Sequence, residues 1–341
     1  MAKVTNYYYE QLNKEQQKAY YAIKQGLLNM QDTIMVPLLS QKEISDIYFL
    51  IRMDCPEIFY TVSFSYKYYA DSTAVEMTPK YLFTKSKIKE HRQAMEARVK
   101  KLANQVAKLD EKGKELFIHD FIVNNVRYDK LKKEYSHEII GALGNGVAVC
   151  EGIAKAVKVL CDELNIWCVI ALSEANPDKG IKYRHAWNVI KIGGKYYHLD
   201  ATFDNTLSKD DTVRYDYVNL ADKQIFRDHE PVIWKVPVCD DGDGFYYKEK
   251  KVSWTTLDEV RNRTKQAVKK GKVLLFHWRG GYLTKEVLQS LLEIFEEEAK
   301  AKDKCSYTSV NLAQAVLRVR FEDGVGCEEI EMEEANEGEK L

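Results

Sequence analysis

The stretch from Asn145 to Asp204 decides how this chain folds, and it reads NGVAVCEGIAKAVKVLCDELNIWCVIALSEANPDKGIKYRHAWNVIKIGGKYYHLDATFD. Its first part carries apolar residues at helical spacing, with charged residues on the other faces, which predicts an amphipathic helix of about four turns. The apolar stripe consists of Ile153, Val157, Leu160, Cys161 and Leu164. Cys150 falls in the first turn, where unpaired backbone N–H groups and the positive end of the helix dipole favour an anion. A thiolate is such an anion, so we expect Cys150 to be a nucleophile at neutral pH.

Two segments rich in aromatic and β-branched residues, 184–192 and 195–201, are separated by a Gly-Gly pair. This arrangement predicts a β-hairpin with a two-residue turn. The turn fixes the register, with Trp187 opposite Asp200, and makes His185 a diagonal neighbour of Asp200 on one face of the sheet. At that separation a carboxylate reaches an imidazole N–H, so we expect Asp200 to bind His185.

A thiol at a helix start, a histidine and a carboxylate supply a nucleophile, a general base that becomes a general acid, and a group that orients the imidazole. The motifs that carry them are Gly-Val-Ala-Val-Cys-Glu-Gly-Ile-Ala, His-Ala-Trp-Asn and Tyr-Tyr-His-Leu-Asp-Ala-Thr-Phe-Asp. In this order they resemble the transglutaminase-like superfamily of papain-fold cysteine enzymes, and bacterial-type transglutaminase-like domains in particular. The resemblance covers roughly residues 106–235, with a closing His-Glu-Pro segment at 229–231. It implies a triad of Cys150, His185 and Asp200, with no cofactor.

The resemblance also implies an enzyme that transfers an acyl group from a peptide or glutamine amide through a thioester. Peptidases, protein cross-linkers, deamidases and peptide-glycan amidases share this first half-reaction, and the residues do not choose among them. A second hypothesis is a catalytically inactive peptide- or protein-binding module built on the same fold. Taken singly, Cys150 reads as a buried apolar residue, His185 as a structural histidine and Asp200 as a turn former. The occurrence of all three residues together, in the order that the family has, favours the enzyme.

Weaker predictions concern the surroundings of these three residues. Oxyanion stabilisation needs at least two donors, of which the backbone N–H of Cys150 is the natural first. Candidates for the second are Asn125, Tyr128 and Asn145. Trp187 shares a strand face with His185 and is a candidate for the cleft wall, although core packing explains it equally well. His198 is the rival histidine, because it lies two residues before Asp200 on the same face.

We expect an α+β chain with a papain-like core, in which the cysteine helix packs on an antiparallel sheet between two accessory domains. The expected units are an N-terminal α+β domain over residues 1–105, the transglutaminase-like core over 106–240, a small α/β domain over 245–325 and an acidic tail over 326–341. The tail has one lysine and few apolar residues, a composition typical of disordered chain.

The composition limits the partners. With 51 Lys and Arg against 52 Asp and Glu, the formal net charge of −1 gives no electrostatic footprint for nucleic acid. No apolar run approaches the roughly 20 residues needed to span a bilayer, and no signal peptide opens the sequence. We therefore expect a cytoplasmic protein, or a secreted one if a leader has been removed. Seven cysteines without Cys-x-x-Cys spacing or clustered histidines indicate neither a disulfide framework nor a metal site. The expected partner is a protein or peptide substrate, and the oligomeric state stays open.

Overall fold

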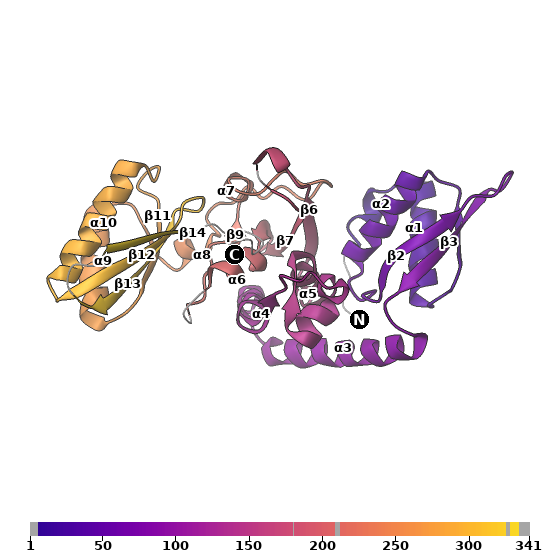
Figure 1. Ribbon diagram of the computed structural model, residues 1–341, viewed down its shortest axis with the longest axis horizontal. Coiled ribbons are helices and arrows are strands. Elements are labelled where there is room, and N and C mark those ends of the chain that lie inside the picture. Colours follow the sequence, from indigo (N-terminus) through magenta and orange to yellow (C-terminus); the bar gives the residue numbers. More distant parts are fainter. Residues whose placement is uncertain (1–5, 180, 209–211, 325–327, 334–341) are drawn as a thin grey trace.

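The computed structural model describes residues 6–179, 181–208, 212–324 and 328–333. Figure 1 shows three groups of elements that follow one another along the long axis in chain order. Each group combines helices with a sheet, which is antiparallel in the first two groups and mixed in the third. The chain is therefore α+β, as expected.

The N-terminal group packs two helices on a three-stranded antiparallel sheet of order β1-β3-β2. Its elements are η1 (Tyr9–Gln11), α1 (Lys14–Leu28), β1 (Ile34–Pro37), α2 (Gln41–Asp54), β2 (Thr61–Lys67) and β3 (Ala74–Tyr81). Both helices begin with a capping box, in which Asn13 or Ser40 accepts a backbone N–H and the side chain three residues later bonds back. The long helix α3 (Lys85–Val106) then leads to the middle group.

The middle group is built around a four-stranded antiparallel sheet of order β6-β7-β8-β9. Its helices are α4 (Glu111–Asn125), η2 (Glu134–His137), η3 (Ile140–Asn145), α5 (Cys150–Glu163), η4 (Pro177–Lys179), α6 (Ala201–Leu207) and α7 (Asp222–Ile225). The sheet strands are β6 (Cys168–Ser173), β7 (His185–Ile192), β8 (Lys195–Leu199) and β9 (Val218–Leu220), and β4 (Arg127–Tyr128) pairs with β5 (Val147–Ala148). The helix that carries Cys150 packs on this sheet, where Ala154 of α5 accepts a hydrogen bond from Asn188 of β7 at 3.0 Å.

Helix α5 is buried more completely than its sequence pattern suggests. Lys155 and Lys158 were expected on its charged faces, but both side chains are fully buried. Each is tolerated because it has anionic partners: Lys155 contacts Glu138 and Glu151, and Lys158 contacts Asp162. Burying an ammonium group without such partners would be prohibitively costly.

The C-terminal group has a five-stranded mixed sheet of order β10-β11-β13-β12-β14. Its elements are α8 (Tyr246–Glu249), β10 (Ser253–Trp254), α9 (Leu257–Lys270), β11 (Leu274–Trp278), α10 (Lys285–Lys300), β12 (Lys304–Asn311), β13 (Val316–Asp323) and β14 (Glu328–Glu333). Gly271 ends α9 in the left-handed region at φ 60°, a conformation that favours glycine at a helix end.

The acidic tail departs from expectation. Residues 328–333 form strand β14, which pairs in parallel with β12, so disorder was the wrong prediction for this segment. The sequence there reads EEIEME, and its alternation of glutamate with apolar residues is a strand signal that the acidic composition obscured. Residues 326–327 and 334–341 lie outside the described part of the chain.

The division into units at residues 1–105, 106–240 and 245–325 remains a proposal, because one apolar cluster extends from Ala19 in α1 to Val218 in β9. Among the residues that the structure describes, no helix is long and apolar enough to cross a membrane.

Candidate active site

Cys150 is the first residue of α5, and 7% of its surface is exposed. The preceding Val149 is extended and donates its backbone N–H to the Ser136 carbonyl at 3.1 Å. Gly152 passes so close to the same carbonyl that a Cβ would lie 2.2 Å from its oxygen. This close approach requires glycine and fixes the helix start, where backbone N–H groups have no partner within the helix.

The hairpin has the register expected from the sequence, with Ile192 paired to Lys195. Its second strand was expected to continue to Ala201, but it ends at Leu199. Asp200 instead caps α6, because its Oδ1 accepts two backbone N–H groups of that helix at 2.8 and 3.0 Å. A short polar side chain at a helix start competes effectively with continued strand pairing.

The carboxylate of Asp200 contacts the His185 ring, with Oδ2 at 2.5 Å from Nε2. Burial acts to raise the pKa of Asp200, but the charge and hydrogen bond of His185, with a further bond from His229, hold that pKa below its usual range. The His185 ring packs against two aromatic rings. Its centroid lies 4.6 Å from that of Phe203 and 5.7 Å from that of Trp187, which stacks on it. Because Nε2 faces Asp200, Nδ1 is the nitrogen that could exchange a proton with a thiol.

His229 also reaches Asp200, although it was not among the expected site residues. Its Nε2 lies 2.9 Å from Oδ2 of Asp200 and its Nδ1 lies 2.8 Å from Oδ1 of Asp228. It follows α7, and 29 positions separate it from Asp200 in the sequence. In the sequence, His229 was noted only as part of the His-Glu-Pro segment that closes the resemblance. That segment did not indicate which residue His229 would contact.

Trp187 and the rival His198 bind each other away from the thiol. The Trp187 indole N–H donates to His198 Nδ1 at 2.9 Å, and His198 Nε2 lies 2.8 Å from Asp222. Because Nδ1 accepts, the proton of His198 sits on Nε2 and is donated to Asp222. The lining described for the cavity around Cys150 includes neither Trp187 nor His198.

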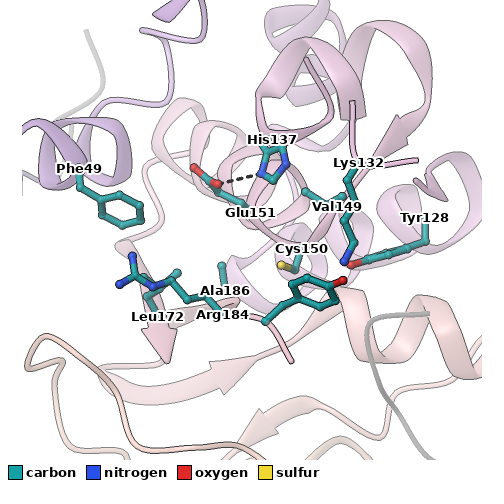
Figure 2. Close-up of a pocket in the computed structure, with 11 residues that line it drawn as sticks. Phe49, Tyr128, Lys132, His137, Val149, Cys150, Glu151, Leu172, Arg184 and Ala186 are labelled. Atoms are coloured by element: carbon teal, nitrogen blue, oxygen red, sulfur yellow. Dashed lines mark hydrogen bonds and ion pairs between the residues drawn. The ribbon is translucent and has the colours of Figure 1, made fainter. Parts of the chain in front are cut away.

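A cavity of about 280 Å³ opens beside Cys150 (Figure 2). Its walls come from α2, from the segment before α5, and from the edge of the sheet on both sides of His185. They are formed by Phe49, Tyr128, Lys132, His137, Val149, Glu151, Leu172, Tyr183, Arg184 and Ala186. Most of these side chains are apolar or aromatic, and the ammonium of Lys132 lies 3.0 Å from the centroid of the Tyr183 ring. The site therefore has room for a substrate side chain next to the sulfur.

The three candidates for a second oxyanion donor lie in different places. Tyr128 lines the cavity with Cys150. Asn125 is exposed and its Nδ2 donates to the Phe121 carbonyl at 2.9 Å, while Asn145 is exposed at the end of η3. The structure thus brings Tyr128 to the thiol and leaves the two asparagines outside the lining.

An ion cluster that includes Glu151, the residue after Cys150, joins α2 to the middle group. Arg52 lies 2.5 Å from Glu138 and 3.1 Å from Glu151, and Lys155 lies 2.8 Å from each of these carboxylates. His137 completes it at 3.1 Å from Glu151 (Figure 2). Burial acts to raise the pKa of Glu151, but Lys155, Arg52 and His137 hold it well below its usual range. The cluster joins residues 52 and 138–155, a pairing that no sequence spacing predicts.

Within the described part of the chain, two groups of side chains each bring three possible metal ligands within 4.8 Å of one another. They are His185, Asp200 and His229, and His198, Asp222 and Cys239. In the first, ring nitrogens lie 2.5 and 2.9 Å from one carboxylate oxygen, which is hydrogen-bond separation. Ligands around a tetrahedral zinc ion lie about 3.3 Å apart. In the second, the hydrogen bond from Trp187 leaves the proton of His198 on Nε2, where a metal would need a lone pair. Both groups are arranged as hydrogen-bond networks.

Comparison with a family model agrees with the motifs. Residues 100–201 match the family model of the transglutaminase-like superfamily. No curated protein matches the chain. Among solved structures, one described as a TGase is similar at 12% identity and a TM-score of 0.29, with 53% of each chain covered. A putative cysteine protease from Cytophaga hutchinsonii is similar at 18% identity and a TM-score of 0.24, covering 41% of this chain and 62% of that one. The chain thus spans less than two thirds of either structure, and its likeness to the family model is confined to residues 100–201.

Proposed function

From the transglutaminase-like domain at residues 100–201, we propose that this chain is a cysteine-nucleophile enzyme that transfers the acyl group of a peptide or glutamine amide. The observation that carries the proposal is the pairing of His185 with a buried, ionised Asp200, while the neighbours of His185, Arg184 and Ala186, line the cavity that contains Cys150. Nucleophile, base and orienting carboxylate are the three parts that such catalysis needs.

In the first half-reaction, His185 takes the thiol proton and the sulfur of Cys150 bonds to the carbonyl carbon of the amide. The C–N bond then breaks, His185 gives the proton to the departing amine, and a thioester remains on Cys150. In the second half-reaction, water or an amine loses a proton to His185 and attacks the thioester, which restores the thiol. Water gives a carboxylic acid, whereas an amine gives a new amide.

The negative charge that develops on the substrate oxygen needs donors fixed in advance. The backbone N–H of Cys150 lies at the start of α5, where the positive end of the helix dipole favours a negative charge. We assign the second donor to Tyr128, since it is the candidate side chain that lines the cavity.

The activated thiol is the first expected result. At neutral pH, iodoacetamide should label Cys150 at least about tenfold faster than Cys55 or Cys239, because burial makes those two thiols harder to ionise. Burial raises the pKa of Cys55 to about 12 and also raises that of Cys239. Intact mass with peptide mapping measures the labelling, and Cys150→Ala is the control. Equal labelling of Cys150 and Cys239 would refute the activated thiolate.

The cavity walls give an expectation for the substrate. Phe49, Leu172 and Ala186 form an apolar surface next to Cys150, so an apolar or aromatic side chain adjacent to the scissile amide should be favoured. Phe49→Ala should raise KM for such a peptide by about tenfold and change kcat less. The reason is that the contact with Phe49 stabilises the bound substrate and the transition state equally.

The matched control for this substitution is Tyr69→Ala, which removes an aromatic ring that is 52% exposed outside the cavity lining. Steady-state kinetics on a peptide series with apolar, aromatic and charged side chains measures both constants. The assignment of the apolar wall fails if Phe49→Ala weakens charged and aromatic peptides equally.

A binding module on the same fold is the second candidate, and the small exposed fraction of Cys150, 7%, is the observation in its favour. Peptide binding that survives Cys150→Ala, together with no turnover of diverse peptides and amines by the unmodified chain, would decide for it. Loss of turnover with retained binding in the same variant would decide for the enzyme.

A further inference from the structure

His229 is held between two carboxylates. It is 6% exposed, its Nε2 faces Asp200 at 2.9 Å and its Nδ1 faces Asp228 at 2.8 Å. A neutral imidazole has one N–H donor, whereas the protonated ring has two. Two facing carboxylates therefore favour the imidazolium. Burial acts to lower the pKa of His229, but the bonds to Asp200 and Asp228 outweigh it and raise the pKa above its ordinary value.

The two histidines share one oxygen of Asp200. Both Nε2 atoms point at Oδ2, and Oδ1 accepts the backbone N–H groups of Thr202 and Phe203. A carboxylate offers about four lone-pair sites, so these four contacts occupy all the hydrogen-bond acceptor sites of Asp200. The orientation of Asp200 beneath His185 therefore depends on His229 as well as on the start of α6.

Asp228 is itself fixed by neighbours from two groups of the chain. Its Oδ2 accepts the Tyr217 hydroxyl at 2.5 Å, and the amide of Gln314 lies 3.4 Å from the same oxygen. Gln314 belongs to the turn between β12 and β13 and is 1% exposed. A line of buried polar contacts thus runs from the C-terminal sheet through Asp228 and His229 to Asp200.

We propose that His229 is a positioning residue of the Cys150 site: as a cation fixed between Asp200 and Asp228, it holds the Asp200 carboxylate beneath His185 and sets how readily His185 releases its proton. The inference rests on the proposed function, in which His185 is the base and acid. His229 acts through Asp200 and its charge, since it does not line the cavity described for the substrate.

The centroids of the His185 and His229 rings lie 5.2 Å apart, so a charge on His229 disfavours a second charge on His185. The ionisable groups that face His229 are Asp200, Asp228, His185, His198 and Tyr217. Burial, opposed by Asp222, lowers the pKa of His198, and burial together with Asp228 raises that of Tyr217. Neither group therefore carries charge at neutral pH. The electrostatic interactions of His229 are then dominated by the two carboxylates and by His185.

Titration of the His185 ring by NMR, on the full chain with ¹⁵N-labelled histidine, tests the charge directly and needs no substrate. His229→Gln should raise the pKa of His185 on the order of one pH unit, because a neighbouring cation is lost. Asp228→Asn should raise it in the same direction but less, since His229 then loses its proton at lower pH. His198→Gln is the matched control, another buried histidine bonded to a carboxylate, and should leave His185 unchanged.

The alkylation rate of Cys150 in the same variants tests positioning. His229→Gln should lower the maximal rate by about tenfold and move the alkaline end of its pH profile upward with the pKa of His185. An unchanged or lowered His185 pKa in both His229→Gln and Asp228→Asn, or an equal shift in His198→Gln, would overturn the inference. If the unmodified chain shows no activated Cys150, the proposed function fails, and the NMR titration still decides whether His229 controls His185.

Discussion

Asp200→Asn is expected to lower turnover by on the order of 10² to 10⁴ while leaving the fold intact. The buried carboxylate accepts the Nε2–H of His185 at 2.5 Å, and its charge stabilises the imidazolium formed during catalysis. An asparagine amide at this place can hold the wrong tautomer of the ring and carries no charge. The helix should survive, because Asp200 caps α6 and asparagine is an equally good N-cap.

The pH profile of Cys150 alkylation tests the direction of the electrostatic effect of Asp200. A charged His185 favours the thiolate, and Asp200 keeps His185 charged, so Asp200→Asn should move the onset of alkylation to higher pH. His198→Gln is the control, since His198 bonds to Trp187 and Asp222 instead. A profile that is identical in the unmodified chain and Asp200→Asn, but shifted in His198→Gln, would show that the wrong strand residues were assigned.

The parts of the site that depend on local rules could be predicted from the sequence. The Gly-Gly turn set the register of β7 and β8, and this was enough to bring His185 to Asp200. The same rules did not show that β8 would end at Leu199, because the carboxylate of Asp200 serves the helix cap and the histidine at once. A pattern of side-chain types cannot express two roles for one residue.

Contacts between distant segments were beyond prediction. Phe49 and Arg52 come from α2, yet one lines the cavity and the other contacts Glu151 beside the thiol. His229 approaches Asp200 from the segment after α7. Nothing in hydrophobic periodicity or turn chemistry encodes such pairings, since they depend on how whole elements pack. Helix α2 therefore belongs to the candidate site in space, although the sequence assigned it to an accessory unit.

Lys155→Met is expected to destabilise the fold by about 3–5 kcal/mol, because it removes one of the buried countercharges of Glu138 and Glu151. Lys155 is fully buried and lies 2.8 Å from both Glu138 and Glu151, of which Glu138 is 1% exposed. Arg52 would then face both carboxylates without the lysine. Methionine keeps most of the side-chain volume, so the loss reports the charge and not a cavity. Urea unfolding followed by circular dichroism measures it.

Two further variants separate the buried ion cluster from general loss of a lysine. Lys42→Met removes a partner of the exposed Lys42–Asp46 pair and should leave the stability nearly unchanged, because solvent screens this pair. Adding Glu138→Gln to Lys155→Met should restore part of the loss, because one unpaired buried charge disappears with it. If the double variant is less stable than Lys155→Met by the full cost of Glu138→Gln alone, the two groups do not interact. In that case the charges of Lys155 and Glu138 do not stabilise the start of α5.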